Sequence, residues 1–543
     1  MTSLVLAPNL DLERLLAALD PEQRAAATLP DGPAQVIAPA GSGKTTTMVA
    51  RLAVLLDRGV PPERICVVTF NRDAVADLAA RIALRRGAAS GAIELRTLHA
   101  LARQVLLDSG ERANLVSDRL PVLRAARRRC MGGGEPEPPD AAMLDTLLSA
   151  WKVERREPPA EARPALSVYA ELMPIRGAID FDDLVVRAVD LLETDAALRG
   201  RWQARFSHVC VDEFQDVDAA QLRLVRLLAA PQDNLFVVGD DDQTIYAWRL
   251  ADVRRILRFA TDYPDARRVM LATNYRCPRT VMEASARVIE VNRERFAKSI
   301  RAPSSLAADP SALQAVDASV DEWPAAMARL ATAEDHAGRS LCFLARTRAE
   351  LTPLLLALVR AGVPHRAAAP PIVEDHRVLA LVREAGCPAP DRHPFHVLRG
   401  LRVDHGWERG SETGDLLSDA DHDALDALLS WTVGFRTTDA FVAAFNVARA
   451  RIATLRSPAA TIELATVHAA KGREWQTVVL VGFEADRIPN RRALLGAADP
   501  ARALEEERRL AYVALTRATR RLILATNPAR PSPFLAEMGF SAG

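Results

Sequence analysis

The stretch QVIAPAGSGKT, residues Gln35 to Thr45, decides the fold class of this chain. It opens on a short apolar run that is typical of a buried strand, and a helical pattern begins near its last residue. A glycine-rich turn in this position directs backbone N–H groups at phosphate oxygens, and the helix N-terminus adds a favourable dipole. The pattern predicts a phosphate-binding loop, in which Lys44 reaches the β- and γ-phosphates of a nucleotide and Thr45 places its hydroxyl on Mg²⁺. A glycine- and serine-rich loop without a ligand is the weaker interpretation.

Two adjacent carboxylates follow a second apolar run, in the stretch VCVDEFQD at residues 209–216. Parallel α/β sheets bind ligands at the carboxyl ends of their strands, where Asp212 and Glu213 are expected. Asp212 suits Mg²⁺ coordination, and Glu213 suits activation of an attacking water. A loop cap is the alternative for an isolated Asp-Glu pair, but the phosphate-binding loop in the same chain favours the metal site.

A third strand end carries the stretch VGDDDQTIYAWR at residues 238–249. Gln243 in this stretch is a candidate sensor of the γ-phosphate or of the attacking water. Tyr246 and Trp248 offer aromatic faces on which bases could stack, at about 1–3 kcal/mol per base. Their position directly beyond an acidic loop favours this role over a pair of buried core aromatics.

Composition and periodicity limit the class of protein. Short β-branched runs alternate with helical patterns through most of the 543 residues, which predicts doubly wound parallel sheets in several domains. Lys plus Arg equals Asp plus Glu at 70 each, so any nucleic-acid site is expected to be a local groove. Six scattered cysteines without a CxxC pair argue against a metal cluster. The absence of a long apolar stretch or a cleavable signal predicts a cytoplasmic protein without membrane contact, and the Ala- and Arg-rich composition is typical of a GC-rich bacterial genome.

The motifs and their order resemble a superfamily 1 DNA helicase of the UvrD/Rep/PcrA type over most of the chain. LDPEQ at residues 19–23 resembles the family's Q motif, TFNRDA at 69–74 resembles motif Ia, and LATNYR at 271–276 resembles motif IV. In the second half, residues 464–475 resemble motif V and residues 505–518 resemble motif VI. The resemblance implies two RecA-like domains that hydrolyse ATP with Mg²⁺ at their interface while gripping single-stranded DNA or a tailed duplex.

The residues and the resemblance together give a set of expected roles. The catalytic residues are Lys44, Asp212, Glu213, Gln243 and two arginine fingers, Arg276 and Arg517. The ATP contacts are Gln23 at the adenine edge, the loop residues Ala38, Pro39, Ala40, Gly41, Ser42, Gly43, Lys44, Thr45 and Thr46, Tyr275 stacking on adenine, and Glu474 at the ribose. The Mg²⁺ ligands are Thr45 and Asp212, and the DNA contacts are Phe70, His99, Tyr246, Trp248, Arg249 and His468. Since both fingers lie far along the chain from the loop, their role requires a second domain to fold over the first.

The implied organisation contains two interrupted domains. A first RecA-like domain is expected over residues 1–100 and 179–275, with a helical insertion over 101–178, and a second over residues 276–365 and 461–543, with an insertion over 366–460. This second insertion is shorter than the family's 2B subdomain. We hypothesise that it lacks the autoinhibition of that subdomain and that a protein partner assists loading or duplex separation. Thr46 stands where close relatives carry an arginine on adenine, so adenine selectivity is expected to rest on Gln23 and Tyr275.

The leading functional hypothesis is an ATP-dependent translocase or helicase on single-stranded DNA, moving 3′→5′, in DNA repair, replication or defence. The alternative is a DNA-stimulated ATPase switch subunit of a repair or anti-phage complex that does not itself unwind. Partner-dependent unwinding of a tailed duplex distinguishes the two. RNA stays open as a substrate, because stacking and backbone contacts discriminate poorly between DNA and RNA.

Overall fold

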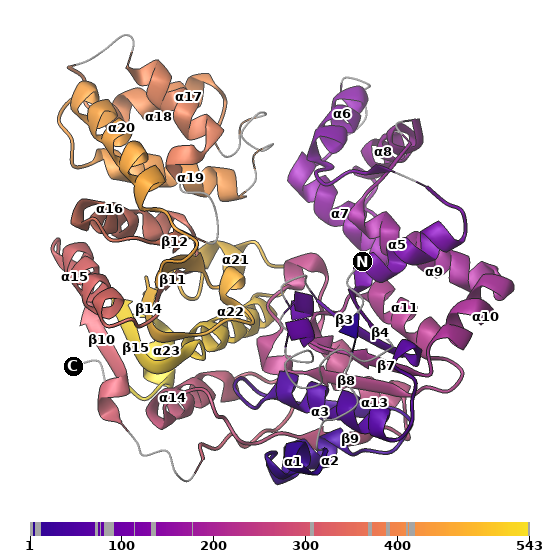
Figure 1. The fold of residues 1–543 in the computed structure, drawn as a ribbon. Coiled ribbons are helices and arrows are strands. Elements are labelled where there is room, and N and C mark those ends of the chain that lie inside the picture. Colours follow the sequence, from indigo (N-terminus) through magenta and orange to yellow (C-terminus); the bar gives the residue numbers. More distant parts are fainter. Residues whose placement is uncertain are drawn as a thin grey trace. The chain divides into compact units, whose positions relative to one another are not determined.

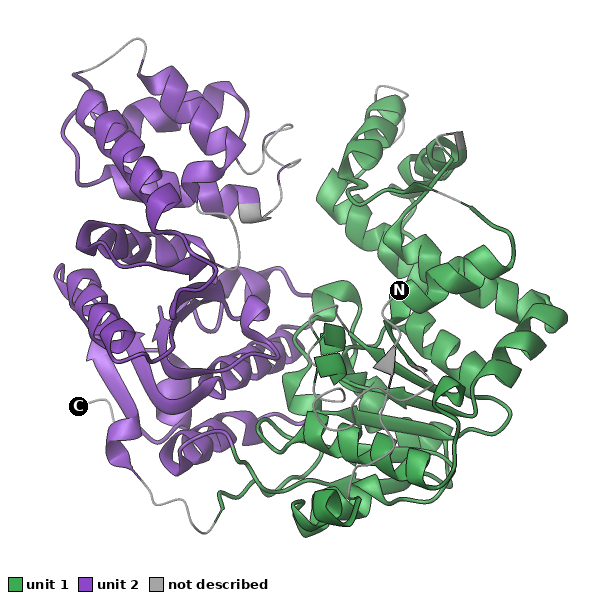
Figure 2. Ribbon diagram, in the orientation of Figure 1, with its two compact units in different colours: residues 1–275, 294–303 green, residues 276–293, 304–543 purple. Residues whose placement is uncertain are grey.

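The computed structural model describes residues 4–5, 12–70, 74–76, 78–80, 92–112, 114–131, 137–175, 177–303, 309–367, 372–386, 391–408, 411, 417 and 419–540. The chain forms two compact units (Figure 2). Unit 1 contains residues 1–275 and 294–303, and unit 2 contains residues 276–293 and 304–543. Residues 294–303 therefore differ from the predicted organisation, which assigned the whole of 276–365 to the second domain.

Unit 1 is built on a seven-stranded sheet with the order β1-β4-β3-β7-β8-β2-β9. The strands are β1 (Leu4–Val5), β2 (Ala34–Ile37), β3 (Ile65–Thr69), β4 (Ala92–Thr97), β7 (His208–Val211), β8 (Leu235–Gly239) and β9 (Arg267–Met270). All neighbours pair in parallel except β1, which runs antiparallel to β4. Strands β2, β3, β7 and β8 are buried along their whole length, which explains their uninterrupted apolar runs. Since β7, β8 and β2 are adjacent, the loops that follow them leave the same edge of the sheet side by side.

The helices of unit 1 cover this sheet and carry a helical insertion. They are α1 (Leu12–Ala17), α2 (Pro21–Ala27), α3 (Lys44–Asp57), α5 (Leu98–Asp108), α6 (Leu120–Cys130), α7 (Ala141–Glu154), α8 (Arg163–Ile175), α9 (Phe181–Thr194), α10 (Ala196–Arg205), α11 (Ala219–Ala229), α12 (Val253–Leu257) and α13 (Phe259–Asp262). Helices α6, α7 and α8 stand beyond α5 and α9, away from the sheet (Figure 1). A short parallel pair, β5 (Asn114–Leu115) with β6 (Ala178–Ile179), closes the base of this insertion.

A buried ion-pair network fixes the insertion to α9. The Asp180 side chain accepts hydrogen bonds from Lys152 of α7 at 2.7 Å, from Arg119 at 3.1 Å and from the Tyr169 hydroxyl at 2.7 Å. Asp180 also caps α9 by accepting from the backbone of Asp183. Burial raises the pKa of Asp180, but the charges of Lys152 and Arg119 outweigh burial and hold this pKa well below its usual range. Asp180 thus anchors the helical insertion to α9 electrostatically.

Unit 2 contains a six-stranded parallel sheet with the order β10-β15-β14-β11-β13-β12. Its strands are β10 (Leu313–Asp317), β11 (Leu341–Ala345), β12 (Arg366–Ala367), β13 (Ile462–Thr466), β14 (Trp475–Val481) and β15 (Ala518–Thr526). Its helices include α14 (Arg279–Glu290), α15 (Trp323–His336), α16 (Thr352–Ala361), α21 (Arg491–Leu495), α22 (Pro500–Leu515) and α23 (Pro533–Glu537). Two mainly parallel sheets flanked by helices confirm the predicted α/β class with two RecA-like folds.

Between β12 and β13 the chain forms a small helical subdomain. Its helices are α17 (His376–Ala385), α18 (Pro394–Asp404), α19 (Asp419–Thr432) and α20 (Thr438–Leu455). Phe441 and Phe445 of α20 pack on Trp431 of α19 with ring centroids 5.5 and 5.4 Å apart. These helices share a continuous apolar core with α16, so the segment is packed onto unit 2 (Figure 1). None of the helices in the described part of the chain has the length and apolar character needed to cross a bilayer.

Candidate active site

The glycine-rich loop follows β2 in the middle of the unit 1 sheet, and its last residues start α3. Gly41 and Gly43 have φ values of +73° and +84°, which L-residues with a side chain rarely adopt. A Cβ on Gly43 would lie 2.5 Å from Gln23 Nε2, so this position also needs glycine for space. Lys44 Nζ donates to the carbonyl of Ala38 at 3.1 Å, which folds the lysine back over the loop.

The Q-motif glutamine and the motif IV aromatic lie against this loop. Gln23 Nε2 donates to the Ser42 carbonyl at 2.9 Å, and Gln23 also completes a capping box with Asp20 at the start of α2. The backbone N–H of Tyr275 donates to the Gly41 carbonyl at 2.8 Å, and the Tyr275 hydroxyl donates to Asp20 at 2.7 Å. The Tyr275 side chain keeps 51% of its surface exposed. The structure therefore places Gln23 and Tyr275 against the backbone carbonyls of the phosphate-binding loop.

Asn274 adds a contact that the sequence reasoning did not assign to any role. Its Nδ2 donates to the Ala40 carbonyl at 2.8 Å, so the residue before Tyr275 also holds the loop. Ser42 is 1% exposed, and its Oγ is a buried polar atom without a hydrogen-bond partner among the described residues. A buried hydroxyl of this kind, in a loop of this shape, fits a phosphate oxygen as its partner.

Asp212 and Glu213 follow β7 directly, and β8 lies between β7 and the strand that precedes the loop. Burial, together with the charge of Glu213, raises the pKa of Asp212 to about 7, and Lys44 acts in the opposite direction. Glu213 has φ +52°, a strained conformation for a residue with a side chain, and its N–H donates to Asp212 Oδ1 at 3.0 Å. A pair of like charges at a buried strand end favours the binding of a cation, and one carboxylate plus a hydroxyl is a donor set that Mg²⁺ shares with substrate phosphates and water.

Gln215 connects the carboxylate pair to the loop after β8. Its Nε2 donates to a carboxylate oxygen of Glu213, and its Oε1 accepts from the backbone N–H of Asp240 at 2.9 Å. Asp240 Oδ2 in turn accepts from Gln243 Nε2 at 2.7 Å. Gln215 and Gln243 are both buried. The predicted water activator and the predicted γ-phosphate sensor are therefore linked by two hydrogen-bonded residues, of which Gln215 was quoted in the sequence without a role.

The acidic residues after β8 are neutralised from a distant part of the chain. Lys298 Nζ lies 2.8 Å from Asp240, 2.6 Å from Asp241 and 2.7 Å from Asp242, and all four side chains are 0% exposed. Arg295 forms a two-pronged pair with Asp242 at 2.9 Å for each contact. Sequence reasoning missed both cations, because a Lys and an Arg in the stretch RERFAK carry no local signal that ties them to an aspartate run some fifty residues earlier.

Four of the predicted DNA contacts form one aromatic cluster beside the carboxylates. Phe70, directly after β3, stacks on Tyr246 with centroids 4.8 Å apart, and Tyr246 meets Trp248 edge-to-face at 6.3 Å. Arg249 lies over the Trp248 ring at 4.6 Å, and 62% of Trp248 is exposed. Burial raises the pKa of Tyr246, and the nearby charges of Asp216 and Glu213 raise it further. The cluster thus presents an open aromatic face from the same sheet edge that carries Glu213.

The two predicted histidines lie in different units. His99, at the start of α5, contacts Phe181 edge-to-face at 5.7 Å, and burial lowers its pKa. Phe181 was not predicted as a contact residue, but 44% of its surface is exposed. His468 lies in a short 3₁₀ helix of unit 2, His468–Ala470, directly after β13. Motif Ia residues Asn71–Asp73 lie outside the described residues.

The remaining predicted ATP contacts all belong to unit 2. Arg276 Nε lies 2.6 Å from Glu474, so the first predicted finger and the predicted ribose contact form an ion pair. Arg276 and Cys277 also lie against the Thr516 carbonyl, which precedes the second finger. Arg517 is buried and donates to the carbonyls of Val513 at 2.8 Å and Arg473 at 3.3 Å. The structure therefore brings Arg276, Glu474 and Arg517 together around the end of α22.

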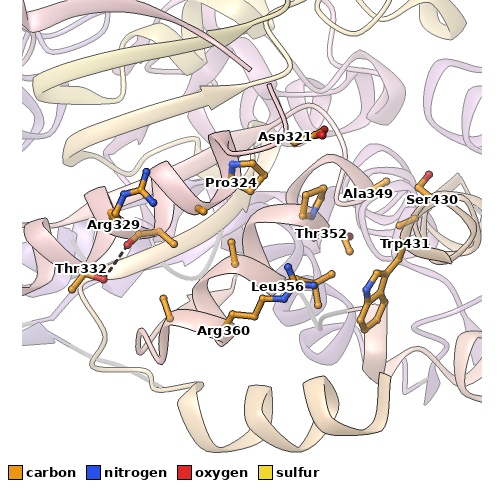
Figure 3. Close-up of a pocket in the computed structure, with 16 residues that line it drawn as sticks. Asp321, Pro324, Arg329, Thr332, Ala349, Thr352, Leu356, Arg360, Ser430 and Trp431 are labelled. Carbon is orange, nitrogen blue, oxygen red and sulfur yellow. Dashed lines mark hydrogen bonds between the residues drawn. The ribbon is translucent and has the colours of Figure 1, made fainter. Parts of the chain in front are cut away.

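A cavity of about 610 Å³ in unit 2 contains none of the predicted residues. It is lined by α15, α16 and α19, with an alanine-rich wall and the side chains of Arg329, Arg360 and Trp431 around it (Figure 3). Since it lies on the helical side of unit 2, away from the motif residues in the sequence, the candidate active site is assigned to the strand ends of unit 1.

Comparison with known proteins agrees with the motifs. The UvrD/REP helicase N-terminal domain matches residues 19–131 and 137–264, and the UvrD-like helicase C-terminal domain matches residues 441–528. DNA helicase II of Salmonella typhimurium is 28% identical over 97% of this chain and 88% of its own length. ATP-dependent DNA helicase UvrD2 of Mycobacterium tuberculosis is 30% identical over 94% of this chain and 79% of its own length. ATP-dependent DNA helicase PcrA of Staphylococcus aureus is 31% identical over 53% of this chain and 42% of its own length. The chain belongs to the UvrD/REP helicase family.

Proposed function

We propose that this protein is an ATP-dependent motor that moves 3′→5′ along single-stranded DNA and separates duplexes. The observation that carries the proposal is the position of the aromatic cluster beside the hydrolytic carboxylates. The charge of Glu213 contributes to the raised pKa of Tyr246, and Trp248 of the same stretch is exposed to solvent. A base stacked on this cluster would therefore act on residues close to the proposed water activator, which is what DNA-stimulated hydrolysis requires.

In this proposal the phosphates bind the backbone N–H groups of the loop and Lys44. Adenine would be bound by the Gln23 amide, which donates to the Ser42 carbonyl, and by the Tyr275 ring, whose hydroxyl donates to Asp20. Thr45 and Asp212 would hold Mg²⁺, which neutralises phosphate charge when bound. Glu213 accepts a proton from the attacking water, and Gln215 fixes the Glu213 carboxylate while Gln243 orients toward the γ-phosphate.

Arg276 and Arg517 of unit 2 are proposed as arginine fingers. A cation beside the γ-phosphate stabilises charge in the transition state and contributes about 10³–10⁵ in rate in P-loop enzymes. The pair between Arg276 and Glu474 would have to rearrange for Arg276 to meet phosphate while Glu474 meets the ribose. We propose that this exchange of partners couples nucleotide binding to movement of unit 2.

The helical subdomain between β12 and β13 is proposed to be a reduced form of the family's second insertion. The alignment with DNA helicase II of Salmonella typhimurium spans 642 positions but contains 97% of the 543 residues of this chain. Over a hundred positions of that relative therefore have no counterpart here. We propose that a protein partner supplies the loading or duplex-separating function of the missing part.

The test is steady-state ATP hydrolysis with and without single-stranded DNA, beside a Glu213→Gln control that keeps the size of the side chain. We expect stimulation by DNA of about tenfold or more in the native chain and loss of hydrolysis in the control, because the amide cannot accept the water's proton. Unwinding of duplexes with a 3′ or a 5′ tail then gives the polarity. An active ATPase that DNA does not stimulate would refute the motor. DNA stimulation without unwinding of either tailed duplex would favour a switch subunit, and efficient unwinding by the chain alone would refute the need for a partner.

A further inference from the structure

Residues 294–303 form a strap that belongs to unit 1 although the chain on both sides of it belongs to unit 2. At one end of the strap, Arg295 and Lys298 are paired with the three aspartates that follow β8. At the other end, Arg301 exchanges backbone hydrogen bonds with Ala272 and Asn274 at 2.9 and 2.8 Å, and its side chain pairs with Glu22 of α2. The strap therefore spans from the acidic loop to the residues that hold Tyr275 and Gln23.

The acidic cluster (Asp240, Asp241 and Asp242) is fully buried, and its ionisation depends on the strap. Burial raises the pKa of Asp240, but the charges of Lys298 and Lys44, together with the hydrogen bonds from Lys298 and Gln243, outweigh burial and bring this pKa to about 2. The pKa of Asp241 is raised to about 6, first by burial and then by its two acidic neighbours, although Lys298 opposes them. The Phe296 N–H donates to Asp241 at 2.8 Å, so the backbone of the strap also contacts the cluster. Lys298 therefore supplies a buried positive charge in contact with all three carboxylates.

Asp240 is the point at which the cluster meets the hydrolytic residues. Its Oδ1 contacts Lys298 at 2.8 Å and its Oδ2 accepts from Gln243 at 2.7 Å, so the two side chains hold opposite oxygens of one carboxylate. Its backbone N–H donates to Gln215, whose amide holds Glu213. The orientation of the Asp240 carboxylate therefore sets the position of the Gln243 amide, and Lys298 is the cation that holds the other oxygen of this carboxylate.

We propose that Lys298 is a positioning residue for ATP hydrolysis, which acts through the Asp240 carboxylate to orient Gln243. This rests on the proposed function for the role of Gln243, and the position of Lys298 itself comes from the contacts above. The strap is covalently continuous with unit 2 at both ends. A displacement of either end is therefore transmitted to Asp240 through its buried ion pair with Lys298. The strap thus provides two of the three covalent connections between the units, and through Lys298 it gives movement of unit 2 a route to the Asp240 carboxylate.

The test begins with Lys298→Met, which keeps an unbranched chain and removes the charge. We expect kcat for ATP to fall about tenfold to a hundredfold, as small misplacements of catalytic groups do, while the dissociation constant of a fluorescent ATP analogue changes less than about threefold. Nucleotide binding is the internal control, because the ion pairs of the Lys298 side chain are with the three aspartates and not with the phosphate-binding loop. A variant with unchanged kcat would overturn the proposal.

A charge-compensated variant separates positioning from folding. Lys298→Met combined with Asp241→Asn removes one positive and one negative charge, so the net charge of the cluster is unchanged, while the amide oxygen introduced by the second substitution is still able to accept from the Phe296 N–H. We expect the melting temperature to recover toward that of the native chain while kcat stays low, because the contact between residue 298 and Asp240 is still missing. Recovery of kcat together with stability would overturn a positioning role.

A double-mutant cycle identifies the route. If Lys298 acts mainly through Gln243, then Lys298→Met should lower kcat far less in a Gln243→Ala background than in the native chain, because residues that act as a unit are non-additive. Additive losses would overturn the route through Gln243. The proposed DNA motor is tested separately by DNA stimulation of the native chain, and these variants are compared by basal hydrolysis, so either proposal fails on its own measurement.

Discussion

Gly239, the last residue of β8, is the position at which one added methyl group should disable the site most directly. A Cβ there would lie 2.6 Å from Gln215 Oε1, 2.8 Å from Ile256 Cδ1 and 3.3 Å from the Gln215 backbone N. Gly239 has no positive φ, so the effect of Gly239→Ala is steric and not conformational. To admit the methyl group, Gln215 must leave its position between Glu213 and Asp240, because its backbone is also too close to give way.

Overpacking of this kind costs about 1–3 kcal/mol of stability. A shift of about 1 Å in a group that orients the nucleophile lowers kcat about a hundredfold. We therefore expect Gly239→Ala to bind a fluorescent ATP analogue normally, to melt a few degrees lower and to lose most of its ATP hydrolysis. The assay is steady-state hydrolysis beside thermal unfolding monitored by circular dichroism.

Gly200→Ala is the matched control for Gly239→Ala. Gly200 lies inside α10, and none of the described residues comes within 4 Å of a Cβ built on it. Replacement of a helical glycine by alanine stabilises by about 0.5–1 kcal/mol, so this variant should melt slightly higher and keep native kcat. Native kcat in Gly239→Ala would refute the inference that Gln215 links the two sides of the site.

Three further predictions concern other parts of the chain. Trp248→Ala should raise the concentration of single-stranded DNA needed for half-maximal ATPase stimulation about fivefold to a hundredfold, since one stacking face is worth about 1–3 kcal/mol; an unchanged concentration contradicts the assignment. Asp180→Asn should destabilise unit 1 by about 3–5 kcal/mol in urea unfolding at pH 7, because it leaves Lys152 and Arg119 short of a buried partner, and the difference should shrink as the pH falls below about 4. Burial raises the pKa of the Glu350 carboxyl to about 7 in the folded chain. The buried charge therefore lowers the free energy of unfolding above pH 7, and this loss disappears below about pH 4.5, where the carboxyl is protonated in both states. Glu350→Gln should raise the melting temperature at pH 8 and leave it unchanged at pH 4.5.

The sequence could predict those parts of the site that are local in the chain. The loop after β2, the carboxylates after β7 and the aromatic stretch after β8 each combine a buried strand with the functional residues directly behind it. Because adjacent parallel strands end at one edge, these three motifs had to meet once the sheet formed. The parallel class itself followed from uninterrupted apolar strands, which only sheets covered on both faces produce.

Contacts that depend on tertiary packing were beyond such reasoning. Asn274 and Gln215 have side chains that donate to or accept from backbone groups, and any Asn or Gln could do so in a loop. The stacking of Phe70 on Tyr246 requires knowledge that β3 and β8 end close together, on either side of β7. No periodicity carries that information, since it is a property of strand order and not of any single strand.

The strap shows why contiguous sequence ranges do not describe the two units completely. Motif IV predicts a single domain boundary after Tyr275. The chain does pass from unit 1 to unit 2 at this point, but residues 294–303 belong to unit 1 again. What brings them back is electrostatic: three buried aspartates in a row would be unstable unless cations reach them, and Arg295 and Lys298 do so within unit 1. In the sequence, the aspartate run is recognised only as an acidic loop that precedes Tyr246 and Trp248. An uncompensated buried charge implies a missing partner elsewhere in the chain, and here that partner lies on the segment that joins the two units.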